Sequence, residues 1–290
     1  MAAGGALVGA PLYTLAAYEG MGRGPAALRR AGFAKSLGAE DLWDVALPPL
    51  KKDAVEEGVK NLSHFRECTT LIYKKIRSIQ TDRLVVVGGE CSETVGAMAG
   101  AAEVFGGKAG MLWMDAHGDF NTPETSPSGY IGGMCLAAAC GRSPKLGIGL
   151  GRNAPIAEER LVHVGSRALD GPEVTSFNSS PVTLFSSGQV RKAGARATAK
   201  LAAKHLEGNS DWIACHLDLD VIDPSFFSAV NYPTPGGLSL EEVAVIIEGV
   251  VATGRLRVLE VVAYNESKDT DGTAARKVVS LIGKVLRLVG

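Results

Sequence analysis

The stretch GMLWMDAHGDFN, residues 110–121, passes from an apolar run directly into three titratable residues at every second position. The run is short, begins at a glycine and consists of large apolar residues, which is typical of a buried strand. In an extended chain, side chains two residues apart point to the same side. If the chain stays extended beyond the run, we expect Asp115, His117 and Asp119 to form one converging row.

Seven further apolar runs of this kind predict a parallel sheet. They lie at residues 6–11, 42–47, 83–89, 161–166, 182–186, 212–220 and 257–265. Amphipathic stretches between them predict helices at residues 25–37, 53–79, 93–105, 132–140, 193–206, 240–252 and 274–288. Apolar strands that alternate with helices are typical of a sheet covered on both faces. We therefore predict a three-layer, doubly wound α/β fold with a mostly parallel sheet of about eight strands.

Composition narrows the class of protein. The chain has 290 residues and no linker-like segment, so we expect a single domain over residues 1–290. Its formal net charge of −1 gives no overall field for nucleic acid or an anionic membrane, and we expect neither as a partner. No apolar run is long enough to span a bilayer. The five cysteines are scattered, which favours reduced thiols and a cytoplasmic location.

A second acidic pair, Asp218 and Asp220, ends another predicted strand. Because the carboxyl ends of parallel strands meet at one edge of a sheet, we expect this pair to face the first row. Four carboxylates on one edge repel one another unless cations lie among them. With one imidazole they exceed the usual protein ligands of a single catalytic zinc ion and suit two bridged metal ions. Oxygen-rich donors with imidazole favour manganese.

Either acidic pattern alone has a simpler interpretation. A lone Asp-x-His-x-Asp is equally consistent with a loop of capping residues, and short acidic pairs are common at strand ends. Two such patterns, each directly after an apolar strand, favour a binuclear metal site. The basic stretch at residues 191–205 is interpreted as a solvated helix face.

Four motifs in this order resemble the ureohydrolase family of arginases and agmatinases. They are GGECS (88–92), DAHGDFN (115–121), SRALDGPE (166–173) and HLDLDVIDPSF (216–226), and the early segment GMGRGPAALRRAGF (20–33) is also similar to arginases. Within the family, the strings GDFNTPET (118–125) and GYIGGM (129–134) are most similar to the Nω-hydroxy-L-arginine hydrolases. The resemblance implies the arginase/deacetylase fold, two manganese ions, a small guanidino substrate, and a homo-trimer or homo-hexamer.

The resemblance also implies roles for individual residues. Asp115 and Asp218 would bridge the metals, Asp119 would bind one of them, and His117 and Asp220 the other. Cys91 stands where the family usually has a histidine ligand, so other divalent metals are possible. Asp119 would also transfer the proton during catalysis. The family's substrate contacts correspond to Asn121, Ser128, Asp170 and Glu173.

Three positions depart from the family pattern. The histidine that shuttles protons in arginases falls at Gly132, a threonine falls at Tyr232, and a glutamate that contacts the guanidinium falls at Ala263. Two alternatives therefore stay open beside hydrolysis of arginine or a derivative such as Nω-hydroxy-arginine to an amine plus urea or hydroxyurea. The first alternative is a non-catalytic homologue that acts as a binding or assembly protein. The second is a C–N hydrolase of the agmatinase or formimino type.

Overall fold

The computed structural model describes residues 5–147 and 155–286. Eight strands form one sheet in the order β2-β1-β5-β10-β9-β6-β7-β8, and every pairing is parallel. This confirms the predicted parallel α/β fold. The strands are β1 (Ala6–Ala10), β2 (Glu40–Asp44), β5 (Leu84–Gly88), β6 (Ala109–Met114), β7 (Leu161–Val164), β8 (Thr183–Phe185), β9 (Trp212–Asp218) and β10 (Leu256–Val262).

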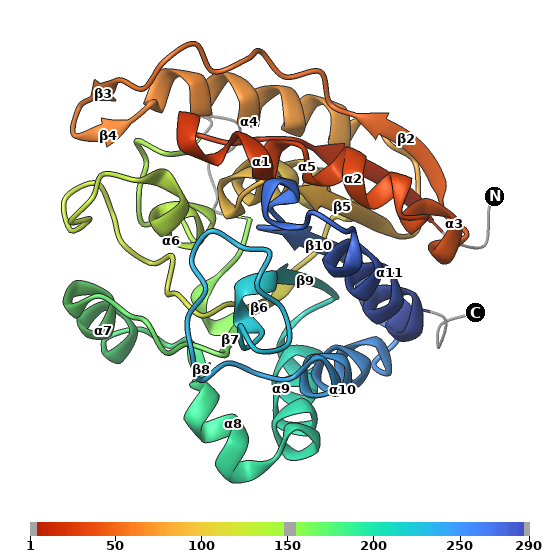
Figure 1. Ribbon diagram of the computed structural model, residues 1–290. Coiled ribbons are helices and arrows are strands. Elements are labelled where there is room, and N and C mark those ends of the chain that lie inside the picture. The colour runs from red at the N-terminus through yellow and green to blue at the C-terminus, as the bar shows by residue number, and fades with distance from the viewer. Residues whose placement is uncertain (1–4, 148–154, 287–290) are drawn as a thin grey trace.

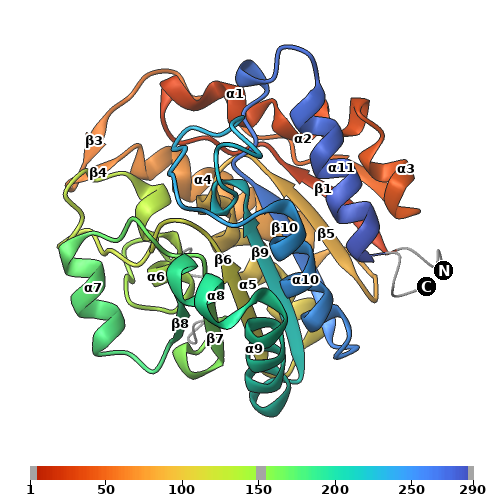
Figure 2. The same cartoon turned by 60° about the horizontal axis from the view of Figure 1, so that its bottom comes forward.

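Helices cover both faces of the sheet and make the outer layers (Figures 1 and 2). One face packs against α2 (Gly24–Arg30), α3 (Phe33–Leu37), α9 (Ala195–Asn209), α10 (Leu240–Val251) and α11 (Thr273–Leu286). The other face packs against α4 (Leu62–Arg77), α5 (Thr94–Phe105) and α6 (Cys135–Ala139). The remaining helices are α1 (Glu19–Gly22), α7 (Gly171–Asn178) and α8 (Ser187–Ala193).

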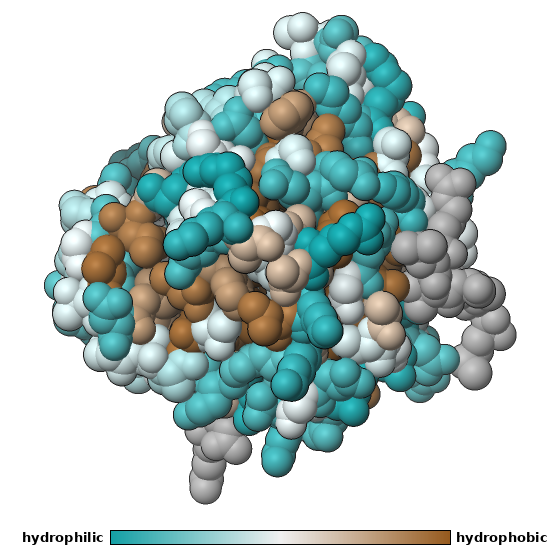
Figure 3. Space-filling model, turned by 90° about the horizontal axis from the view of Figure 1, so that it is seen from below, coloured by the Kyte–Doolittle hydropathy of each residue, from teal (hydrophilic) through white to brown (hydrophobic). Residues whose placement is uncertain are grey.

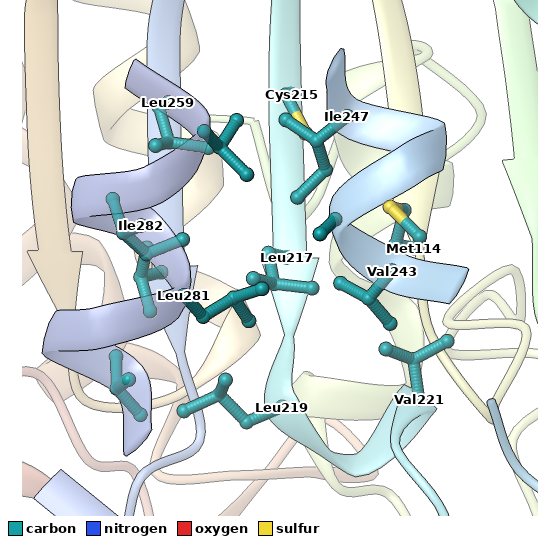
Figure 4. Packing of buried hydrophobic residues seen from close by; sticks show 14 of the residues in the cluster. Met114, Cys215, Leu217, Leu219, Val221, Val243, Ile247, Leu259, Leu281 and Ile282 are labelled. Carbon is teal, nitrogen blue, oxygen red and sulfur yellow. The ribbon is translucent and has the colours of Figure 1, made fainter. Parts of the chain in front are cut away.

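The centre of the sheet is buried on both sides, as its apolar sequence requires. All residues of β9 are buried, and Leu217 lies between Val243 of α10 and Leu281 of α11 (Figure 4). This packing fixes the end of β9, and with it Asp218, against a rigid layer. Polar residues cover much of the face in Figure 3, and apolar side chains gather near its centre. No helix within the described ranges is both long and apolar enough to span a membrane.

Two helix predictions were wrong in detail. The helix predicted over residues 53–79 begins only at Leu62, because residues 53–61 hold a hairpin of β3 (Val55–Glu56) and β4 (Val59–Lys60) that turns at Gly58, φ +80°. The helix predicted over residues 25–37 is broken into α2 and α3 by Gly32, φ +94°. The last two residues of the predicted helix 274–288 lie outside the described ranges. Helices α7 and α8 were not predicted, because both are short.

Glycine allows α5 to approach α4 closely, and this predicts a stability effect. A Cβ at Gly96 would overlap the backbone carbonyl oxygen of Thr69 in α4. We expect Gly96→Ala to lower the free energy of unfolding by about 1–3 kcal/mol through overpacking, although alanine is the better helix former. Gly208 in α9 has open space around it, so Gly208→Ala is the matched control and should be neutral or stabilising. Denaturant unfolding of both variants measures the difference, and equal shifts would contradict the packing account.

Candidate active site

A cavity of about 330 Å³ opens at the carboxyl ends of the central strands. It collects side chains from the loops that follow β5, β6, β7 and β9. All ten sequence-predicted site residues line it: Cys91, Asp115, His117, Asp119, Asn121, Ser128, Asp170, Glu173, Asp218 and Asp220. The three departing positions, Gly132, Tyr232 and Ala263, line it too. The structure therefore brings the predicted residues together, while their individual roles stay predictions.

The acidic residues converge through turns, because the chain does not stay extended beyond β6, the condition on which the predicted row of side chains depended. Strand β6 ends at Met114, and the Asp115 carboxylate accepts a hydrogen bond from the backbone N–H of His117 (2.7 Å). Asp119 then takes a left-handed conformation, φ +49°. Likewise β9 ends at Asp218, whose carboxylate accepts from the N–H of Asp220 (2.6 Å). At both positions an Asx turn replaces the hydrogen bonds between neighbouring strands, because short acidic side chains hydrogen-bond readily to the backbone two residues on.

The carboxylates are buried and poorly compensated. Burial raises the pKa of Asp218 and Asp119 well above the usual range, and neighbouring carboxylates raise each of them further. Burial alone would lower the pKa of His117, but its contacts with Asp115 and Asp220 raise it to about 12. The His117 Nδ1 atom lies 3.0 Å from an Asp220 carboxylate oxygen.

No lysine or arginine is among the described residues that line the cavity. The nearby Arg167 instead donates to backbone oxygens, among them those of Asp220 (2.6 Å) and Thr234 (2.8 Å). Among the described residues that line the cavity, one imidazole thus accompanies six buried carboxylates, a balance that favours bound cations.

Two groups of side chains have metal-binding geometry among the described residues. Asp115, His117 and Asp220 form one, and Cys91, Asp115 and His216 form the other; within each group the donor atoms lie within 4.8 Å of one another. The shared Asp115 links the two groups. The donor types therefore fit a pair of divalent ions, while Asp119 and Asp218 lie in the same cavity outside both tight groups.

Two thiols contact the carboxylates. The Cys91 thiol donates to an Asp218 carboxylate oxygen (2.9 Å), and the Cys135 thiol donates to an Asp119 oxygen (3.4 Å). Burial raises the pKa of the Cys91 thiol well above its ordinary value, and its contacts with Cys135 and Asp218 raise it further. Without a cation the thiol is therefore protonated.

The side chain of Glu173 joins two of the segments that line the cavity. Glu173 accepts backbone hydrogen bonds from Phe120 (3.0 Å) and from Asp170 (2.9 Å), which joins the loop after β6 to the start of α7. Asn121 donates its side-chain amide to Asp170 (3.0 Å). Ser128 is exposed beside them. Glu173 and Asn121 are buried, whereas Asp170 and Ser128 are exposed, and all four line the cavity.

The three departing positions lie on the cavity wall, and two of them are next to aromatic rings. A Cβ at Gly132 would overlap the ring of Tyr130, so the small residue leaves room for this ring. The Tyr130 hydroxyl donates to the buried Glu90 (3.0 Å). Tyr232 packs edge-on against His117, with ring centroids 5.7 Å apart. Ala263 holds a positive φ of +67° at the cavity wall, a conformation that costs a non-glycine residue energy.

Sequence reasoning missed several residues around the carboxylates. Trp113 donates from Nε1 to Asp115 (3.1 Å), and its ring stacks on that of His216 at 3.6 Å. The signal for His216 was present, because it precedes Asp218 by two residues on one strand and so faces the same side. Glu90 and Tyr130 carried no comparable pattern.

A parallel α/β sheet with a buried carboxylate cavity at its strand ends defines the class, an α/β protein with a candidate metal centre. A profile of the arginase family matches residues 3–287. The arginase of Bacillus subtilis is 31% identical over 97% of this chain and 98% of its own length. The arginase of Bacillus caldovelox superposes with a TM-score of 0.90 at 29% identity, with 97% of each chain covered.

A formimidoylglutamase of Bacillus subtilis also superposes, with a TM-score of 0.79 over 97% of this chain and 85% of its own. At 18% identity this likeness shows the shared fold alone. The profile match and the arginase relatives show that the chain belongs to the arginase family, whose members are metal-dependent hydrolases.

Proposed function

We propose that this protein hydrolyses the guanidino C–N bond of arginine or of an arginine derivative such as Nω-hydroxy-L-arginine. The products would be ornithine and urea, or ornithine and hydroxyurea. The observation that carries the proposal is the buried cluster of Asp115, Asp119, Asp218 and Asp220 with the imidazole of His117. The same cavity is also lined by amide, hydroxyl and further carboxylate groups. The family and the arginase relatives support the guanidino group as the target.

The donor set suits two divalent metals, with manganese expected where carboxylates and His117 dominate. Asp115, His117 and Asp220 would hold one ion, while Cys91, Asp119 and Asp218 would complete the centre with the shared Asp115. When bound, such a pair lowers the pKa of water, so that hydroxide is available near neutral pH.

This chain's residues have separate tasks in the reaction. Asp119 would accept the proton of the attacking water and pass it to the leaving nitrogen, since its carboxylate lies in the cavity beside the proposed metal ligands. Asn121 and Ser128 would bind the substrate carboxylate, and Asp170 its ammonium group. Glu173 would keep these groups in register, because both of its oxygens hold backbone N–H groups.

The altered inner wall supports a modified guanidine. Ala263 and Gly132 offer no charge to a guanidinium cation, whereas a hydroxyguanidine is less basic and needs no such partner. The Tyr130 and Tyr232 hydroxyl groups lie on the same wall. We therefore propose that Nω-hydroxy-L-arginine is cleaved more efficiently than arginine.

A panel of guanidino compounds tests the function. The protein loaded with manganese is assayed with arginine, Nω-hydroxy-L-arginine, agmatine and formiminoglutamate, and the products are identified. We expect urea or hydroxyurea together with ornithine, and weak turnover of agmatine, which lacks the carboxylate. Formamide release from formiminoglutamate alone would favour the formimino alternative. No turnover by a fully loaded protein would favour a non-catalytic homologue.

The proposed ammonium contact makes a sharper prediction at Asp170. We expect Asp170→Asn to raise KM for arginine-type substrates about tenfold, because a charged hydrogen bond to the ammonium is lost. Asparagine also caps helix N-termini well, so α7 should keep its start. The matched control is an arginine analogue without the α-amino group, for which wild type and variant should have equal KM. An equal loss for both substrates would mean that Asp170 serves only the loop.

A further inference from the structure

His216 is a wholly buried histidine that the proposed mechanism does not use. Its Nδ1 atom contacts a Glu260 carboxylate oxygen (2.8 Å) and the Thr94 hydroxyl (2.9 Å). Its ring stacks flat on Trp113. Its Nε2 atom has no hydrogen-bond partner among the described residues, and the side chain is 0% exposed. A buried polar atom without a hydrogen-bond partner is costly, so this one calls for an explanation.

The free nitrogen belongs to a side chain that lies beside two residues of the cavity wall, Cys91 and Asp115, although His216 does not line the cavity itself. A ring nitrogen of His216, the Cys91 sulfur and an Asp115 oxygen lie within 4.8 Å of one another. Because Nδ1 already contacts Glu260 and Thr94, Nε2 is the nitrogen available to this group. His216 lies on β9, and Asp115 follows β6, its neighbour in the sheet. Cys91 follows β5, which β10 separates from β9.

The surroundings of His216 match those of metal-binding histidines in general. Such histidines donate their second ring N–H to a carboxylate, which fixes the tautomer and leaves the other nitrogen free to bind. Glu260 on β10 is that carboxylate here, and it is itself held by the Thr94 hydroxyl (2.8 Å). The Trp113 ring stacks on the His216 ring and so fixes its plane, and the Trp113 Nε1 atom donates a hydrogen bond to Asp115.

We propose that Cys91, Asp115 and His216 form a zinc-selective site, with Glu260 as the residue that positions His216. This deepens the proposed function and rests on it in one respect, since Asp115 is shared with the second ion. Thiolate and imidazole are the donors that zinc prefers, whereas the group of Asp115, His117 and Asp220 has two carboxylates and favours manganese. The centre would then be a mixed zinc–manganese pair. Binding displaces the thiol proton of Cys91 to solvent and breaks its hydrogen bond to Asp218.

Metal competition on the wild-type protein tests the selectivity. Metal-free protein is equilibrated with zinc and an excess of manganese, desalted and analysed. We expect about one zinc ion per chain to survive an excess of manganese. X-ray absorption at the zinc edge should show one sulfur neighbour and imidazole scattering. Two manganese ions per chain without retained zinc, or a zinc shell without sulfur or imidazole, would overturn the proposal without any variant.

Cobalt titration then assigns the ligands, because thiolate ligation gives Co²⁺ an intense near-ultraviolet charge-transfer band. We expect Cys91→Ser to abolish the band. His216→Gln and Glu260→Gln should each weaken zinc binding about tenfold or more. Cys215→Ser, a buried thiol on the same strand as His216, is the control and should keep the band. Unchanged zinc affinity in folded His216→Gln would show that this residue is no ligand.

The two proposals fail in different ways. If the protein holds zinc with the thiolate band but cleaves no guanidine, the zinc site stands and the proposed function falls. If it cleaves guanidines with two manganese ions and shows no thiolate band, the function stands and the zinc site falls.

Discussion

Asp218→Asn is expected to abolish guanidine hydrolysis while leaving the metal-free fold intact. Asparagine has the shape of aspartate but lacks the negative charge that would help to bind the metal ions of the proposed centre. Losing the several kcal/mol that such a centre contributes to transition-state stabilisation corresponds to a fall in kcat on the order of 10³-fold or more. Activity assays and metal analysis of the purified variant measure the effect, and the metal content should fall with the rate.

Stability measurements separate this loss from misfolding. Asp218 is buried beside other carboxylates, and this raises its pKa, so a neutral side chain relieves repulsion in the metal-free protein. Metal-free Asp218→Asn should therefore unfold at the same temperature as wild type or higher, and metal should stabilise only the wild type. Asp82→Asn, at an exposed position before β5, is the control and should change neither property. A variant that keeps its metal and its rate would remove Asp218 from the centre.

Trp113→Ala is expected to have the largest effect on stability. Trp113 is 0% exposed, stacks on His216 and donates to Asp115. Removal of a buried aromatic side chain of this size costs about 3–5 kcal/mol in free energy of unfolding. Because the cavity left behind lies under Asp115 and His216, metal affinity should fall as well. Denaturant unfolding and metal titration measure the two effects.

Two other substitutions show what the ring itself contributes. Trp113→Phe keeps an aromatic ring beside His216 and loses the N–H donor to Asp115, so we expect a cost of about 1 kcal/mol. Trp43→Ala, at a side chain that is 71% exposed, should change stability little. A Trp113→Ala variant as stable as Trp43→Ala would contradict the packing described for β6 and β9.

The strands could be predicted from the sequence because a central parallel strand must be apolar on both faces. Residues 212–220 and 257–265 show this pattern, and both lie in the sheet as β9 and β10. Helix boundaries were less well predicted where local turns interrupt an amphipathic pattern. Gly58 and Gly32 take positive φ values at these turns. A pattern based only on the spacing of apolar residues does not detect such glycines.

The acidic cluster was equally visible, because titratable residues directly after buried strands must gather at one edge of the sheet. Asp115 and Asp218 therefore converge as expected. The path of the chain directly after each strand was not predicted. Asp115 and Asp218 each accept a hydrogen bond from the backbone N–H two residues on, and the backbone turns there. The competition between a side chain and the strand ladder for the same N–H group is decided by local geometry.

The linear pattern of residues was sufficient for the fold class and for the place of the carboxylates, since burial and charge repulsion act on them directly. Which other side chains face these carboxylates depended on the order of the strands. Glu260 reaches His216 because β10 lies beside β9, and His216 stacks on Trp113 because β9 lies beside β6. Strand neighbours are set by packing between distant segments, and no short-range periodicity encodes that choice.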